Sequence, residues 1–139
     1  MSDVVLDASV VLKWFGRRGE QHETQALEVR SAYDAGALTV LTPPLLALEI
    51  VNVAGRRWRS DESLLIDLAA DVEALGFEVR EARLEGIARW TARGLSAYDS
   101  AYVALAEETG AKLVTDDTRV LSLASGVTIG LINWRRTGT

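Results

Sequence analysis

The stretch SAYDSAYVALAEETGAKLVTDD, residues 96–117, predicts a helix followed at once by a buried strand. Ser96 is a typical helix N-cap residue, and Gly110 is typical of the left-handed position that ends a helix. KLVT, residues 112–115, is then a short apolar strand, and it stops at two consecutive aspartates. A helix leading into a buried strand is the repeating unit of a parallel α/β fold.

The rest of the chain continues this alternation. We expect a helix after the capping hydroxyl of Thr42, opening on Pro43 and Pro44 and ending near residue 60. The other expected strands are residues 3–6, 38–41, 77–80 and 127–132, and the other expected helices are residues 9–15, 20–35, 61–75, 84–93 and 117–124. This order predicts right-handed crossovers and a three-layer α/β/α domain with a mostly parallel sheet of four to five strands.

Length and composition fit one globular domain over residues 1–139, because 48% of the residues are hydrophobic and 25% are charged. The absence of cysteine excludes a disulfide scaffold and cysteine-based zinc or nucleophile chemistry. No signal-peptide pattern and no long apolar run is present, so we expect a cytoplasmic protein without a membrane segment. The net charge of −5 argues mildly against a nonspecific nucleic-acid binder, but it also fits carboxylates gathered around a cation.

Aspartates follow directly on two of the expected strands. Asp7 ends the first strand, and Asp116 and Asp117 end the strand at residues 112–115. Because the carboxyl ends of parallel strands meet at one edge of the sheet, these side chains should lie together. Asp99 lies in the first turn of the helix after Ser96. Each aspartate has an alternative structural role as a helix cap or as a favourable charge near a helix start.

Glu49 is harder to explain structurally. It lies past the first turn in LLALEIVNVA, residues 45–54, a helix that is apolar nearly all the way round and is therefore expected to be buried. A lone carboxylate in such a place would cost several kcal/mol unless it were paired or bound to a cation. An arginine partner and a metal ion are the two alternatives.

Taken together, these carboxylates would repel one another within a few ångströms, and some would stay protonated without a cation. Mg²⁺ or Mn²⁺ resolves the conflict, because both prefer oxygen ligands and keep several waters. The chain offers no competing catalytic set, since its one histidine, His22, is expected on a solvated helix face.

With these residues in view, the chain resembles the PIN domain family, and specifically the VapC-type toxin ribonucleases of toxin–antitoxin pairs. The resemblance is carried by four segments in order: VLDASVVLKWF, PPLLALEIVNVA, LSAYDSAYVALAEETGAKLVT and LVTDDTRVL. The family pattern of threonine, any residue, aspartate favours Asp117 over Asp116 as the fourth acid.

The resemblance implies a Mg²⁺- or Mn²⁺-dependent endoribonuclease that cuts RNA, with transfer RNA and ribosomal RNA both plausible. It also implies a homodimer that is held inactive by a cognate antitoxin. The implied catalytic and metal-binding residues are Asp7, Glu49, Asp99 and Asp117, of which Asp7 and Asp99 are the first choices for direct ligands. Ser9, Thr115 and Asp116 are accessory residues in this interpretation, although capping roles fit Ser9 and Thr115 equally well.

Cations near the acids are candidates for phosphate contacts, and they are Lys13, Arg17, Arg18, Arg56 and Arg57. Solvated arginines and partners of surface acids are the alternative roles for these residues. The four tryptophans are expected in core or dimer packing rather than on bases.

Two other functions use similar features. A receiver-like phosphotransfer domain also places acids around magnesium, but it needs an aspartate after the middle strand, and FEVREAR, residues 77–83, has none. A non-catalytic PIN-fold module that only binds a partner would not need all four acids. A structure-specific DNA nuclease is disfavoured by the short length of the chain.

Overall fold

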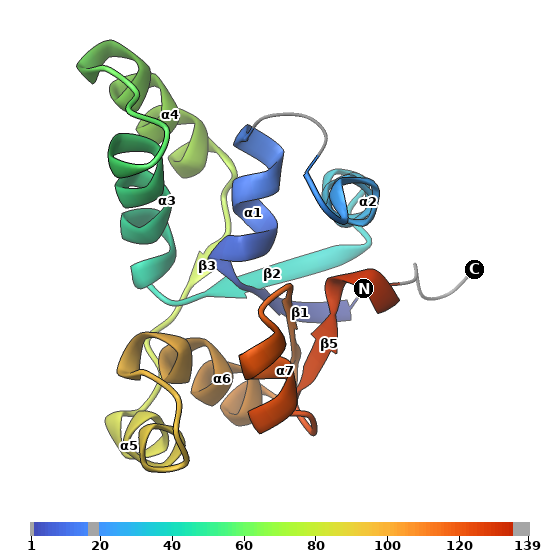
Figure 1. Ribbon diagram of the computed structural model, residues 1–139. Coiled ribbons are helices and arrows are strands. Elements are labelled where there is room, and N and C mark those ends of the chain that lie inside the picture. Colours follow the sequence, from blue (N-terminus) through green and yellow to red (C-terminus); the bar gives the residue numbers. More distant parts are fainter. Residues whose placement is uncertain (1, 17–19, 135–139) are drawn as a thin grey trace.

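The computed structural model describes residues 2–16 and 20–134, and a five-stranded parallel sheet lies at its centre (Figure 1). The strands lie in the order β3-β2-β1-β4-β5, and every pairing is parallel. They are β1 (Ser2–Leu6), β2 (Leu38–Thr42), β3 (Glu78–Val79), β4 (Lys112–Thr115) and β5 (Thr128–Gly130). The predicted α/β class with four to five mostly parallel strands is therefore confirmed.

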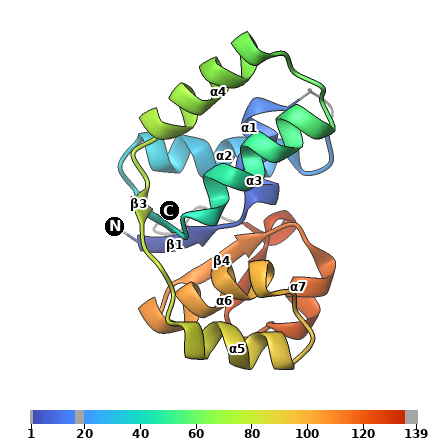
Figure 2. The same cartoon turned by 90° about the vertical axis from the view of Figure 1, so that its left-hand side faces the viewer.

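Helices cover both faces of the sheet, so the domain has three layers (Figures 1 and 2). One layer holds α1 (Ala8–Phe15), α2 (Glu23–Asp34), α3 (Leu45–Arg56) and α4 (Glu62–Ala74). The other layer holds α5 (Leu84–Ala92), α6 (Ala97–Thr109) and α7 (Thr118–Leu123), and a 3₁₀ turn, η1 (Leu131–Asn133), follows β5. No helix within residues 2–16 and 20–134 combines the length and the apolarity needed to cross a membrane.

The strand order reverses direction next to β1. The chain first adds β2 and β3 on one side of β1 and then returns to add β4 and β5 on the other side. Leu6 of β1 is opposite Val114 of β4, and the Asp7 amide donates to the Val114 carbonyl at 3.2 Å. In open α/β sheets the crevice at such a reversal is the usual ligand-binding place. Asp7 and the residues after β4 therefore meet at that crevice.

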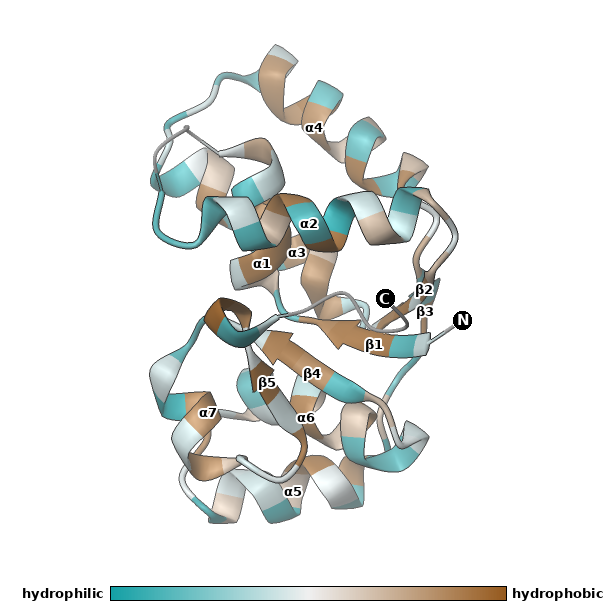
Figure 3. Ribbon diagram, turned by 90° about the vertical axis from the view of Figure 1, so that its right-hand side faces the viewer, coloured by the Kyte–Doolittle hydropathy of each residue, from teal (hydrophilic) through white to brown (hydrophobic). Residues whose placement is uncertain are grey.

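The core forms around β1 and β4, which are covered on both faces and are apolar without alternation. Val5, Leu6 and Val114 are fully buried. Tyr102 and Leu105 of α6 belong to the same core and cover the face of β1 and β4 on the α6 side. Figure 3 shows the apolar colour along most of β1 and at the end of β4, between helices with polar outer faces. Trp90 and Trp134 are buried in this core, as expected for packing residues.

Helix α3 differs from its prediction in both its bounds and its burial. It begins at Leu45 and ends at Arg56, and Thr42 is not its cap. Thr42 instead extends β2, because its carbonyl accepts from the Arg80 amide at 2.9 Å in the ladder with β3. The helix is also not buried all round, since Leu48 is 68% exposed. Apolar residues such as Leu48 also lie on its solvent-facing side. The spacing of apolar residues in the sequence therefore could not show that this side of the helix is exposed.

Candidate functional site

Asp7 is the most enclosed carboxylate at the crevice. It follows β1 directly and is only 9% exposed. Its Oδ2 accepts hydrogen bonds from the Ser9 hydroxyl at 2.9 Å and from the Thr115 hydroxyl at 2.7 Å. Burial raises the pKa of Asp7, the two hydroxyl donors oppose that rise, and the nearby charge of Asp99 adds to it. Asp7 is thus a buried acid that has donors but no described cationic partner.

The same two hydroxyls also tie the end of β1 to the end of β4. The Thr115 oxygen accepts from the Asp117 amide at 3.1 Å, and the Ser9 oxygen accepts from the Asp116 amide at 3.1 Å. Thr115 is completely buried. Each hydroxyl donates to Asp7 and accepts from the β4–α7 connection, so its orientation is fixed from both sides.

Glu49 reaches the crevice from the first half of α3. Burial raises the pKa of Glu49 to about 7, and the charges of Asp7 and Asp99 contribute to the rise. Among the described residues, no arginine or lysine forms an ion pair with Glu49, so the arginine alternative is not realised there. Its elevated pKa thus reflects burial first and, in addition, the negative charges of Asp7 and Asp99, as expected for carboxylates that share a site.

Tyr102 is a site residue that sequence reasoning missed. Its side chain is buried, and its hydroxyl has no hydrogen-bond partner of ordinary geometry among the described residues. It lies close enough to Glu49 to lower the pKa of that acid, while burial and the neighbouring acids raise the pKa of Tyr102 itself. The signal was present in AYDSAY, because positions 99 and 102 share one face of a helix.

Asp99 and Asp117 complete the set from the other half of the chain. Burial and the charge of Asp117 raise the pKa of Asp99, and Arg119 partly offsets this. The Asp99 amide donates to the Ser96 hydroxyl at 3.0 Å, which confirms the Ser96 cap, and a hydrogen bond of the Asp99 carboxylate with the Ser96 side chain opposes the rise in its pKa. Asp117 caps α7 through one oxygen, Oδ1, which accepts from the amides of Arg119 and Val120 at 2.9 and 3.2 Å.

Asp116 has a different environment from Asp117. Its carboxylate lies 3.3 Å from the Lys13 ammonium and 2.7 Å from His22 Nδ1. The expectation that His22 lies on a solvated helix face is therefore wrong, since its side chain is 17% exposed. The reason is that α2 begins only at Glu23, so His22 occupies the left-handed position before it, with φ 60°. The negative charge of Asp116 is paired with Lys13 of α1. Its contacts with Lys13 and His22 join α1 and the residue before α2 to the end of β4.

The proposed cationic residues fall into three groups. Lys13 is paired with Asp116 and also lies 3.8 Å from Glu20. Arg56 and Arg57 are exposed at the end of α3, and no described acid pairs with them. Arg17 and Arg18 lie outside the described residues.

The donor set fits a hard divalent cation that keeps part of its water shell. Within residues 2–16 and 20–134, no three His, Cys, Asp or Glu side chains approach closely enough to hold one ion by themselves. Mg²⁺ is commonly bound through only one or two carboxylates plus water. Asp7, Glu49 and Asp99 all have raised pKa values because of burial and mutual repulsion, so a cation would relieve an existing electrostatic cost.

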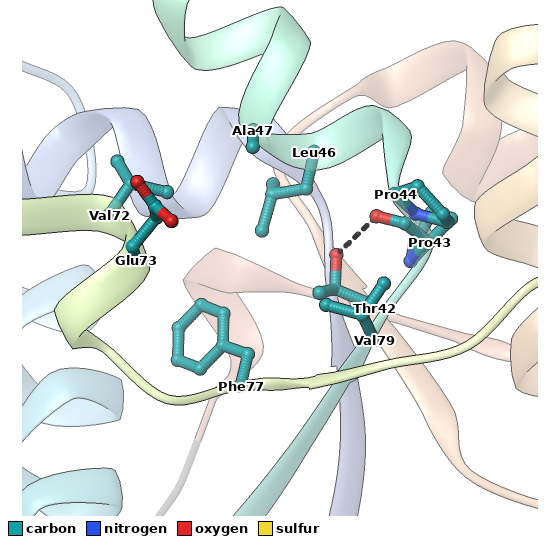
Figure 4. Close-up of a pocket in the computed structure, with 9 residues that line it drawn as sticks. All are labelled: Thr42, Pro43, Pro44, Leu46, Ala47, Val72, Glu73, Phe77 and Val79. Carbon is teal, nitrogen blue, oxygen red and sulfur yellow. Dashed lines mark hydrogen bonds between the residues drawn. The ribbon is translucent and has the colours of Figure 1, made fainter. Parts of the chain in front are cut away.

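A separate apolar pocket of about 250 Å³ contains none of the four acids. Figure 4 shows it between the start of α3, α4 and the segment leading to β3, with Leu46, Val72 and Phe77 around a shared space. The Thr42 hydroxyl is bonded to the Pro43 carbonyl at 3.3 Å on one side of it. The lining of this pocket is mostly apolar, with Thr42 and Glu73 as its polar side chains, and the candidate site is the carboxylate crevice.

We predict that the stability of the metal-free protein falls as the pH rises, in part because of Glu49. Its pKa of about 7 lies above the ordinary 4.5, so the folded state binds this proton more tightly than the unfolded state does. The stabilisation is fully present below pH 4.5 and is lost as the pH rises through about 7. Thermal unfolding in a chelator should show a shallower decline over this range for Glu49→Gln than for the unmodified chain. Equal slopes would contradict the assignment.

Comparison with known proteins was consistent with this architecture. A family model described as PIN domain matches residues 4–125. The structure of PAE2754 from Pyrobaculum aerophilum has a TM-score of 0.67 and 20% identity, covering 94% of this chain and 90% of that chain. The structure of FitAB bound to an IR36 DNA fragment has a TM-score of 0.56 and 14% identity, covering 96% of this chain and 99% of that chain. These likenesses show a shared fold, and no curated protein matches the sequence.

Proposed function

This chain belongs to the PIN domain family, and from this premise we propose that it is a Mg²⁺- or Mn²⁺-dependent endoribonuclease, the toxin of a VapBC-type toxin–antitoxin pair. The family supports a nuclease-like fold and hydrolase chemistry at a coarse level. The observation that supports the finer proposal is the electrostatic coupling of acids from distant segments: in addition to burial, the charge of Asp99 raises the pKa values of Asp7 and Glu49, and the charge of Asp117 raises the pKa of Asp99.

Each acid has a distinct place in the proposed reaction. Asp7 and Asp99 would hold the cation, and the Asp117 oxygen that is not used to cap α7 would bind it or its water. A bound divalent cation supplies a water of lowered pKa and positive charge for the phosphate. Glu49, whose pKa is raised by burial and by the charges of Asp7 and Asp99, would orient the attacking water or bind a second cation.

The hydroxyls of Ser9 and Thr115 act indirectly in this mechanism. Both donate to Asp7 Oδ2, so they orient the carboxylate and leave its Oδ1 for the crevice. Hydrogen bonds of this kind to a metal-binding carboxylate set its direction and its basicity.

Metal dependence is the direct test of the proposal. We expect purified protein to cut total RNA when Mg²⁺ or Mn²⁺ is present and to lose that cleavage in a chelator. Readdition of the ion should restore it, and Asp99→Asn should reduce it by about 10²–10³-fold, the range seen when one transition-state stabilising group is removed. Mapping of the cut ends would show whether transfer RNA or ribosomal RNA is the substrate. Cleavage that persists in the chelator would refute the proposal.

The partners in this proposal are RNA, a cognate antitoxin and a second copy of the chain, in the cytoplasm. Large apolar side chains are exposed on α4, β3, α5 and η1, and a protein partner would cover some of them. They are Leu64, Ile66, Val79, Leu84 and Ile132. FitAB, which has a similar fold, was solved bound to DNA, and that supports a nucleic-acid-associated role for this chain as well.

A further inference from the structure

Two consecutive aspartates follow β4, and their carboxylates lie in different surroundings. Asp117 caps α7 and lies close enough to Asp99 for its charge to raise the pKa of that acid. Asp116 instead contacts Lys13 of α1 and His22, the residue before α2. Asp117 has extended backbone angles, with φ −86° and ψ 111°, and successive side chains of an extended chain point to opposite sides. The connection after β4 therefore presents one aspartate to the other acids and the other aspartate to α1.

Asp116 is held through both its side chain and its backbone. Its Oδ2 lies 3.3 Å from the Lys13 ammonium and its Oδ1 lies 2.7 Å from His22 Nδ1, so each oxygen has its own partner. Its amide donates to the Ser9 hydroxyl at 3.1 Å, and Ser9 donates to Asp7 Oδ2 at 2.9 Å. Ser9 and Lys13 are four residues apart and therefore lie on one face of α1. One face of α1 thus holds Asp116 at two points, and one of these contacts continues directly to Asp7.

The contacts of Asp116 are well enclosed for charged groups. The side chains of Lys13, His22 and Asp116 are 11%, 17% and 18% exposed. Charged side chains are rarely enclosed to this degree unless they are paired. Lys13 is also poorly placed to contact a phosphate, because little of its side chain reaches solvent. Its second acidic neighbour, Glu20, is 3.8 Å away and is more exposed than Asp116. The cluster of Lys13, His22 and Asp116 therefore fits a support of the site better than a part of the substrate surface.

We propose that Lys13 and His22 are positioning residues, which hold the Asp116 carboxylate out of the crevice so that Asp117 alone of the pair faces the cation. The inference rests on the metal site of the proposed function and assigns roles to residues that do not touch the cation. Without these two partners the Asp116 carboxylate would be free to turn, and its amide would no longer hold Ser9 against Asp7. Loss of such support typically changes metal affinity or activity about 10- to 100-fold.

The first test measures Mn²⁺ binding directly, by electron paramagnetic resonance of the free ion, so it does not depend on RNA cleavage. If charge alone mattered, removing a positive charge near the site would strengthen cation binding. Lys13→Met should instead weaken Mn²⁺ binding about 10- to 100-fold, because the ligands lose their orientation. Lys112→Met is the matched control, since it removes the other lysine of the chain from a contact with the Gly126 carbonyl at the start of β4. This control should bind Mn²⁺ like the unmodified protein.

His22 offers a pair of substitutions that suit its backbone and differ in one donor. Its φ of 60° is left-handed, a conformation that asparagine and glycine tolerate. His22→Asn keeps a nitrogen that can donate to Asp116 and should retain the Mn²⁺ affinity, whereas His22→Gly removes the donor and should weaken binding. This pair also tests the inference if Lys13→Met does not fold. Combining Lys13→Met with Asp116→Asn should weaken binding less than the sum of the two separate changes, because both act through one contact.

The outcomes separate this inference from the proposed function. Weaker Mn²⁺ binding by Lys13→Met and His22→Gly, without RNA cleavage by the unmodified protein, would support the positioning role and overturn the nuclease proposal. Metal-dependent cleavage with unchanged or tighter Mn²⁺ binding by these variants would overturn the positioning role and leave the nuclease proposal standing. A rise in KM for RNA alone would make Lys13 a phosphate contact, and the inference would be wrong.

A purely structural role of the cluster gives a further distinct result. The variants would then melt at lower temperature, but their Mn²⁺ affinity well below the melting temperature would equal that of the unmodified protein, and the inference would be wrong. If the unmodified protein bound no Mn²⁺, both the inference and the metal site of the proposed function would be wrong.

Discussion

Asp7→Asn should abolish RNA cleavage and, at the same time, stabilise the metal-free protein. The substitution keeps the shape of the side chain and an oxygen that can accept from Ser9 and Thr115, but it removes the negative charge. Loss of a charged group that holds the cation should lower kcat/KM by at least about 10²–10³-fold. Cleavage assays at saturating Mg²⁺ would measure this effect.

The stability change has the opposite sign because Asp7 is a buried acid. Burial raises the pKa of Asp7 in the folded state, so its favourable contribution is complete only below its ordinary value of 3.8 and is lost as the pH rises through the raised value. Asparagine avoids this loss. The melting temperature of Asp7→Asn in a chelator should therefore exceed that of the unmodified chain near neutral pH, and Mg²⁺ should narrow the difference. An active variant, or one with a lower melting temperature in the chelator, would contradict the assigned role.

Thr115→Val should impair both the fold and the reaction, because one hydroxyl serves two partners. Valine matches threonine in shape, so the change removes the donor to Asp7 and the acceptor for the Asp117 amide and little else. Leaving such buried groups unsatisfied costs about 1–3 kcal/mol of stability. Lost orientation of a metal-binding carboxylate should reduce cation affinity or activity about 10- to 100-fold. Chemical denaturation and the Mg²⁺ dependence of cleavage are the two measurements.

Thr115→Ser is the matched control for that experiment. It keeps the hydroxyl and removes one buried methyl group, so it should lose roughly 1 kcal/mol of stability and keep most of the activity. The two variants thus separate the packing of the Thr115 methyl group from the orientation of Asp7 by the Thr115 hydroxyl. If serine lost as much activity as valine at saturating Mg²⁺, the hydroxyl would not be the functional group.

The alternation of elements could be predicted because local chemistry and tertiary structure agree along most of the chain. Gly76 and Gly110 adopt left-handed φ values of 70° and 72° just after helices, as their positions predicted. The apolar strands before Asp7 and Asp116 are buried centrally in the sheet, so their ends had to meet. The same local logic failed at Thr42, where pairing with β3 outweighed a capping preference.

Contacts between distant segments could not be predicted in the same way. His22 and Asp116 lie 94 positions apart, and only the fold shows that they meet. Charge and periodicity also could not separate Asp116 from Asp117, since both follow β4 directly. The exposure of Leu48 and Tyr98 was hidden for a related reason, because an apolar residue on a helix usually predicts burial. Features that depend on which face a neighbouring layer covers require the three-dimensional arrangement.

The reversal of strand order beside β1 has a consequence for how the protein is made on the ribosome. β1 emerges first, yet its neighbour β4 emerges more than a hundred residues later, as the separation of 108 positions between Asp7 and Thr115 shows. Until then β1 has an open edge, and the nascent chain carries Asp7, Glu49 and Asp99 but not Asp117. If the proposed nuclease function holds, a growing chain would not cut RNA near its own ribosome, because the site between the ends of β1 and β4 forms only when β4 has joined the sheet.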